Sequence, residues 1–124
     1  MSPRSEEFMA SARERLELAR IALVAGFPSG TANAAYYAMF YAARAALSEE
    51  ERNARTHRGV WSLFRELFVV SGRFDEELFR AAQRGQDLRE AGDYEARMIS
   101  PGEGKAIVAD ADRFVSAIAD LLGA

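Results

Sequence analysis

The most informative run in this chain is residues 34–47, which read AAYYAMFYAARAAL. Alanine is the strongest helix former, and the run contains neither glycine nor proline to interrupt a helix. Ser29 and Thr31, just before it, can each cap a helix N-terminus. The sequence therefore predicts a helix that begins near Ser29 or Thr31 and extends through Leu47.

Helical periodicity continues on both sides of this run. Apolar residues recur at three- and four-residue spacing, and no alternating apolar run is bounded by turn residues, as a strand would be. We expect further helices over residues 5–25, 57–70 and 75–92, and one that starts at Pro101. Short connections favour antiparallel neighbours, so the predicted fold is all-α, an up-and-down bundle of four to five antiparallel helices.

The helix ends carry recognisable signals. The sequence Gly26-Phe27-Pro28 stops the first helix, and Thr56 and Asp75 are expected to cap the third and fourth. Gly92 is expected to close the fourth helix. Ser100-Pro101-Gly102-Glu103 combines a capping serine, proline at the first helical position and glutamate at the third, which predicts a capping box. The charged residues 48–56 are expected to form a frayed, mobile connection.

Length and composition restrict the classes of function. At 124 residues the chain fits one domain, residues 1–124. Cysteine is absent and His57 is the single histidine, so we expect no metal site and no cofactor. No apolar run reaches the length of a membrane span and no signal peptide is evident, so we expect no membrane association and a cytoplasmic protein. With 16 basic and 19 acidic residues the net charge is −3, so any contact with nucleic acid must be local.

Four blocks of sequence, in order, carry a resemblance to a known family. Residues 34–47 resemble the tyrosine- and alanine-rich second helix of the HEPN family. The resemblance continues through residues 56–64 (THRGVWSLF), 71–74 (SGRF) and into Leu88-Arg89 with Asp93-Tyr94. It covers about half of the chain. It implies a four- or five-helix bundle that commonly forms a homodimer and is often encoded beside a minimal nucleotidyltransferase as a toxin–antitoxin pair.

Many HEPN proteins are metal-independent ribonucleases, with an arginine, four to six residues and then a histidine as their motif. In this chain the resemblance places Arg89 at the arginine position, but Tyr94 occupies the place of the histidine and Asp93 precedes it. An arginine can hold a phosphate in bidentate fashion, whereas tyrosine is a weak base at neutral pH. The Arg-x4-His spacing does occur at Arg52 and His57, but its place before the third helix argues against it.

The candidate site residues each have two interpretations. Arg89, Asp93, Tyr94 and His57 are the candidate catalytic residues; Arg89 and Asp93 could instead tie the end of the fourth helix to the next loop, and His57 could be a capping or exposed residue. Arg89, Tyr94, Tyr37 and Arg44 are the candidate nucleotide- or RNA-binding residues. Tyrosines at helical spacing more often fill a core or a dimer seam, and Arg44 could lie on a solvated face.

Three functions stay open at this point. The chain is expected to be one half of a toxin–antitoxin pair with a minimal nucleotidyltransferase, and to bind RNA or a nucleotide. The alternatives are a metal-independent ribonuclease toxin and a non-catalytic structural dimer. The homodimer is expected from the family and from the small residues Ala34, Ala38, Ala42 and Ala45, which would let two helices approach closely.

Overall fold

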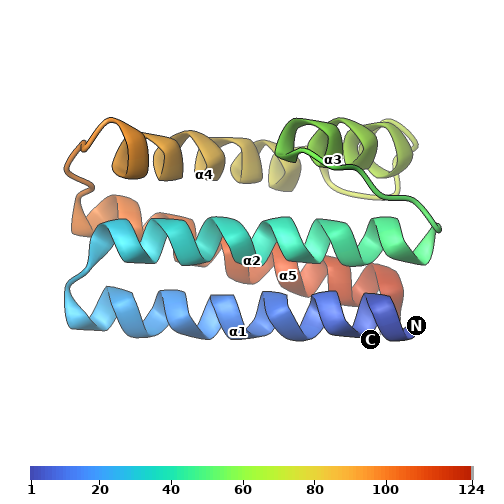
Figure 1. Cartoon of the computed structure of the whole chain (residues 1–124), viewed down its shortest axis with the longest axis horizontal. Coiled ribbons are helices and arrows are strands. Elements are labelled where there is room, and N and C mark those ends of the chain that lie inside the picture. The colour runs from blue at the N-terminus through green and yellow to red at the C-terminus, as the bar shows by residue number, and fades with distance from the viewer. Residues whose placement is uncertain (124) are drawn as a thin grey trace.

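The chain folds as a bundle of helices in a computed structural model that describes residues 1–123. The helices are α1 (Pro3–Ala25), α2 (Pro28–Glu49), α3 (His57–Phe64), the π-helical turn η1 (Arg65–Val69), α4 (Glu76–Tyr94) and α5 (Pro101–Leu122). No strand occurs within residues 1–123. The four long helices α1, α2, α4 and α5 alternate in direction, with α3 and η1 inserted as a shorter segment between α2 and α4 (Figure 1). The all-α prediction is confirmed.

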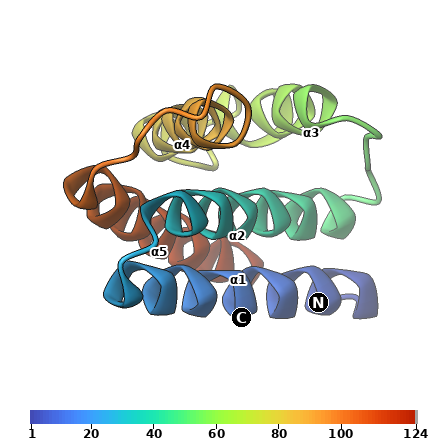
Figure 2. The ribbon, with the colours of Figure 1, turned by 60° about the vertical axis from the view of Figure 1, so that its left-hand side comes forward.

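Helix α2 is the centre of the bundle. It contacts α1, α3, α4 and α5, and Figures 1 and 2 both show it between the layer of α1 and the layer of α3 and α4. A helix that is apolar on all sides is stable only when it is covered on all sides. That condition is largely met here: one stripe of α2, which contains Tyr37, Tyr41 and Arg44, is half-buried, and the rest of its circumference is buried, with the residues Ala32, Ala34, Ala35, Ala38, Ala42, Ala43, Ala45 and Ala46 among those covered.

This packing corrects one sequence-based argument. Ala34, Ala38, Ala42 and Ala45 were expected to line a close approach between two protomers, but each is at most 2% exposed within one chain. The close approach that their small size permits is between α2 and its own neighbouring helices. These alanines therefore offer no surface to a second copy.

Several predicted helix ends are confirmed. Thr56 Oγ1 accepts from Gly59 N at 2.9 Å, and Asp75 Oδ1 accepts from Glu77 N at 2.7 Å. Helix α5 begins at Pro101 with the full capping box between Ser100 and Glu103.

Other helix ends differ from prediction. Helix α1 begins at Pro3, with Ser2 as its cap, and α2 begins at Pro28 with no side-chain cap. Helix α2 also runs beyond Leu47, and the third helix changes to π-helical hydrogen bonding at η1. Gly92 lies inside α4 rather than ending it.

Gly92 has a packing role. A Cβ at this position would lie 2.7 Å from Cδ1 of Ile99, which is closer than real Cβ contacts come. The glycine therefore lies where the connection after α4 packs back against the helix, and a larger residue would require the end of the Ile99 side chain to move.

No helix within residues 1–123 combines the length and the apolar character needed to cross a membrane.

Candidate functional site

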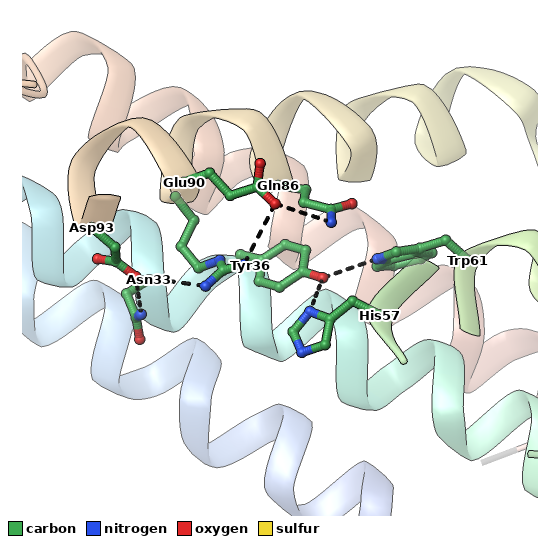
Figure 3. Close-up of polar contacts among 8 residues, drawn as sticks. Asn33, Tyr36, His57, Trp61, Gln86, Glu90 and Asp93 are labelled. Atoms are coloured by element: carbon green, nitrogen blue, oxygen red, sulfur yellow. Dashed lines mark hydrogen bonds and ion pairs between the residues drawn. The ribbon is translucent and has the colours of Figure 1, made fainter. Parts of the chain in front are cut away.

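Tyr36 joins α2 to α3 through its hydroxyl group. Its side chain is fully buried in the middle of α2. Trp61 Nε1 donates to the Tyr36 oxygen at 3.0 Å, and His57 Nδ1 lies 2.8 Å from the same oxygen, both from α3 (Figure 3). Burial raises the pKa of Tyr36 to about 12, although the hydrogen bond from Trp61 acts in the opposite direction. Tyr36 is therefore a neutral phenol that holds the start of α3.

These two hydrogen bonds also define the tautomer of His57. The indole of Trp61 can only donate, so it uses one lone pair of the Tyr36 oxygen. Within residues 1–123 the Tyr36 oxygen has no further hydrogen-bond partner, so the arrangement that leaves no buried donor unpaired has the hydroxyl donating to His57 Nδ1. A neutral imidazole that accepts at Nδ1 carries its proton on Nε2. His57 is thus set up to donate a hydrogen bond from Nε2.

His57 belongs to an aromatic cluster rather than to an open helix end. Its ring stacks on Phe40 with 4.2 Å between centroids and 21° between planes, and meets the edge of Tyr37 at 5.6 Å. Burial lowers the pKa of His57 below its ordinary value, with further lowering from the positive charges of Arg89 and Arg44. The imidazole is therefore neutral at pH 7.

Arg89 enters the same cluster from α4. It is only 6% exposed, and its Cζ lies 5.0 Å from the ring centroid of Tyr36, 5.5 Å from Tyr37 and 5.7 Å from Tyr94. Burial by itself would lower the pKa of Arg89, but the surrounding tyrosines outweigh this effect and raise it. The guanidinium therefore keeps its positive charge inside a cage of aromatic rings.

One hydrogen-bond donor of Arg89, its Nε, is buried and is not satisfied by a protein acceptor in the described part of the chain. Carboxylate oxygens of Asp93 and Glu90 lie 3.7 and 3.8 Å from the terminal nitrogens, which is beyond hydrogen-bond distance. A buried donor without a partner is costly, so the arrangement suits a guanidinium whose Nε receives its acceptor from a ligand.

Asp93 and Tyr94 lie at the end of α4 beside Arg89. Asp93 Oδ2 accepts from Asn33 Nδ2 at 3.0 Å and faces Arg89, so it connects α2 with α4 (Figure 3). Tyr94 is 77% exposed while its ring remains near Arg89. The hydroxyl of Tyr94 is accordingly the accessible one, whereas Tyr36 is closed to solvent.

Tyr37 and Arg44 extend the cluster along α2. Tyr37 is half-buried, touches both His57 and Arg89, and has Arg15 of α1 at 5.6 Å from its ring. Arg44 lies 5.9 Å from the ring of Phe40, on which His57 stacks. The six residues singled out from the sequence thus lie around one aromatic cluster formed by α2, α3 and α4.

Sequence reasoning missed the residues that hold this cluster together. Tyr36 was expected to be a packing residue, like the other tyrosines of its helix, and Phe40, Trp61 and Asn33 were not considered for the site. One signal was present in the sequence. Consecutive Tyr36 and Tyr37 lie about 100° apart on a helix and so point in different directions, which indicates different surroundings for the two rings.

No metal is implied by this geometry, and within residues 1–123 no three His, Asp or Glu side chains are grouped as metal ligands. The cluster instead offers a fixed positive charge, a neutral imidazole with a free Nε2, and exposed aromatic surface. These groups suit recognition of a phosphate and of an adjacent planar base.

The HEPN domain model matches residues 5–121 of this chain. The chain belongs to the HEPN family. This HEPN protein is 30% identical to the UPF0332 protein glr0978 of Gloeobacter violaceus, over 98% of both chains. It is 31% identical to "Putative toxin MJ0605" of Methanocaldococcus jannaschii, over 86% of this chain and 80% of the relative. A second protein of that organism, "Putative toxin MJ0142", is 30% identical over 73% of this chain and 62% of the relative.

Proposed function

We propose that this HEPN protein binds a phosphate of RNA or of a nucleotide at the Arg89–His57 cluster, and that it acts in the cytoplasm as the toxin-like half of a toxin–antitoxin pair. The observation that carries the proposal is the guanidinium of Arg89, which is buried among three tyrosine rings with an unpartnered Nε. Two similar proteins bear the word toxin in their names. That likeness supports the biological setting.

Binding of labelled single-stranded RNA in EDTA tests the proposal. Arg89→Gln removes the charge while keeping a polar side chain of similar length, and should weaken binding roughly tenfold or more, as the loss of a charge-assisted hydrogen bond does. Arg80→Gln, at an exposed position of α4, is the matched control. Because Arg89 is buried, circular dichroism must show that the variant is folded. A folded Arg89→Gln protein with unchanged affinity would contradict the proposal.

A ribonuclease is the second candidate, and the placement of His57 favours it. His57 and Arg89 come from different helices but both contact Tyr36, so a proton-transfer group and a phosphate-binding cation share one cluster. Cleavage of labelled RNA in EDTA is the measurement. His57→Asn should abolish cleavage and leave binding within about threefold of wild type. If wild type leaves the RNA intact, the binding function alone remains.

The proposed partner protein is a minimal nucleotidyltransferase. Tyr94, which is 77% exposed and has Arg89 at 5.7 Å from its ring, offers an accessible hydroxyl beside the Arg89 cluster. If the partner modifies this chain, the Tyr94 oxygen would attack the α-phosphorus of a nucleoside triphosphate, release pyrophosphate and give up its proton to solvent. Co-expression with the neighbouring gene and mass spectrometry would show one added nucleotidyl group in wild type. Tyr94→Phe should lack it, while Tyr41→Phe should retain it.

A homodimer is the proposed assembly. Because the alanines of α2 are buried within the chain, the support now comes from the second half of α1 and the turn after it, where Leu18, Ile21, Val24 and Phe27 are between 50% and 90% exposed. Large apolar side chains grouped on one face are typical of association surfaces.

A further inference from the structure

A pocket of about 200 Å³ lies between the start of α1, the end of α2 and the connection to α3. Three arginines line it, Arg4, Arg44 and Arg52, against one carboxylate, that of Glu51. The chain as a whole carries a net charge of −3. The positive charge of this pocket is therefore a local feature, and it lies outside the Arg89 cluster.

Arg44 connects the pocket with the aromatic cluster. Its Cζ lies 4.6 Å from the ring of Phe8 inside the pocket, and 5.9 Å from the ring of Phe40, on which His57 stacks. Arg4 approaches the same Phe8 ring at 4.5 Å. Two guanidinium groups thus meet at one aromatic side chain, close to His57.

The charges of Arg44 and Arg52 are not neutralised by the protein. Within residues 1–123 neither forms an ion pair, whereas Arg4 pairs with Glu7 at 3.3 Å. Aromatic contacts leave the in-plane N–H groups of a guanidinium free, and those groups match the oxygens of a phosphate.

The backbone that carries Arg52 is strained. Arg52 N donates to the carbonyl oxygen of Leu47 at 2.9 Å and Glu51 N donates to that of Ser48 at 3.0 Å, which closes α2 in a Schellman motif. Glu51 occupies the left-handed position with φ of 56°, where glycine is usual. Strain of this kind recurs at ligand sites. It holds Arg52 at the edge of the pocket.

The two walls of the pocket are clamped together. Glu49 Oε2 accepts from Ser5 Oγ at 2.6 Å and from Ser2 N at 3.1 Å, which ties the first turn of α1 to the end of α2. The hydrogen bond from Ser5, followed by that from Ser2, lowers the pKa of Glu49. The clamp keeps Arg4 and Arg44 on opposite sides of a preformed pocket.

We infer that this pocket binds a second phosphate of the RNA strand, next to the phosphate held at the Arg89–His57 cluster. Phosphate is indicated by the arginines of the pocket, while RNA as its source rests on the proposed function. The half-buried rings of Tyr37 and Tyr41 lie 6.1 Å apart on α2, with Arg89 against Tyr37 and Phe8 of the pocket against Tyr41, and bases can stack on them. The substrate class is therefore single-stranded RNA that spans at least two phosphates, and not a mononucleotide.

Titration with inorganic phosphate tests the pocket without RNA. The NMR chemical shifts of the Nε–H groups of Arg44 and Arg52 in the ¹⁵N-labelled full-length chain should change as phosphate is added. The change should level off at high phosphate concentration, as it does when a site becomes fully occupied. Arg13 is the internal control, because it is exposed and lies nine residues from Arg4, about two and a half turns and thus on the opposite side of α1. Shifts at Arg52 that are as weak and unsaturated as those at Arg13 would overturn the inference.

RNA binding separates this inference from the proposed function. Arg52→Gln should weaken binding of a labelled single-stranded RNA pentamer about three- to tenfold. It should also reduce the slope of the logarithm of the binding constant against the logarithm of the salt concentration by roughly 0.7, the value for one phosphate contact. Arg13→Gln should change neither. If Arg52→Gln behaves like Arg13→Gln while Arg89→Gln loses binding, this inference fails and the proposed function stands. If only Arg52→Gln loses binding, the proposed function fails and the pocket stands.

Discussion

One phenolic oxygen, that of Tyr36, links the polar groups of the candidate site. It accepts a hydrogen bond from the indole N–H of Trp61 and donates one to His57. The guanidinium of Arg89 lies over the ring that carries this oxygen. These contacts are buried, and a buried polar group that loses its partner keeps its full desolvation cost. Stability and site geometry are therefore coupled at this residue.

Replacing Tyr36 by phenylalanine should cost about 1–3 kcal/mol of unfolding free energy, because Trp61 Nε1 and His57 Nδ1 would both lose their partner. Urea unfolding followed by circular dichroism measures this loss. Tyr41→Phe is the control, since Tyr41 is half-buried and has no hydrogen bond within the described residues; it should change stability by less than about 0.5 kcal/mol. Equal effects of the two changes would argue against the Tyr36 network.

The single histidine makes the titration of the site directly measurable. The pKa of His57 is lowered, so the unfolded chain binds a proton near pH 6.5 and the folded chain only at lower pH. Between these values the unfolded state holds more protons, and stability must fall as the pH drops below about 6.5. NMR of the imidazole should give a midpoint below 6.5 with the proton on Nε2.

A matched variant checks that His57 causes this pH dependence. His57→Asn should flatten the stability profile between pH 6.5 and the titration midpoint of the folded protein. A midpoint at or above 6.5 in wild type would mean that the imidazole is not held as the neutral acceptor of Tyr36.

Among the elements, α5 has the best-defined start. Ser100 Oγ accepts from Glu103 N at 3.1 Å, and Glu103 Oε1 accepts from Ser100 N at 3.0 Å. Arg97 also binds the Glu103 carboxylate at 2.7 Å. The two bonds between Ser100 and Glu103 are local in sequence, which is why the four-residue pattern at 100–103 was sufficient to predict them; the Arg97 contact was not predicted.

Ser100→Ala should lower the unfolding free energy by about 0.5–2 kcal/mol, because it removes the acceptor for one free N–H of α5. Thermal unfolding of the full chain is the measurement. Ser116→Ala is the control on the same helix, at an exposed interior position where alanine is the better helix former. A Tm that falls for Ser116→Ala but not for Ser100→Ala would contradict the capping role.

For the molecule as a whole, the proposed homodimer predicts a specific interface. Sedimentation of wild type at micromolar concentration should give twice the 13.7 kDa mass of the chain. Ile21→Glu places a charge in the exposed apolar face of α1 and should weaken association at least tenfold, while the fold stays intact because Ile21 is 57% exposed. Ala109→Glu, at an exposed position of α5, should leave the dimer unchanged. A monomer at every concentration would remove the dimer from the proposal.

The amino-acid sequence by itself determined the helices, because periodicity, caps and alanine content act over four to seven residues. It could not determine how Tyr36 and Tyr37 divide between core and surface, since both fit the helical pattern. Only the tertiary structure decided that α3 folds back so that His57 meets Tyr36, and that α4 places Arg89 over the same ring. Those contacts join residues 21 and 53 positions apart, and packing between helices, rather than local preference, sets them.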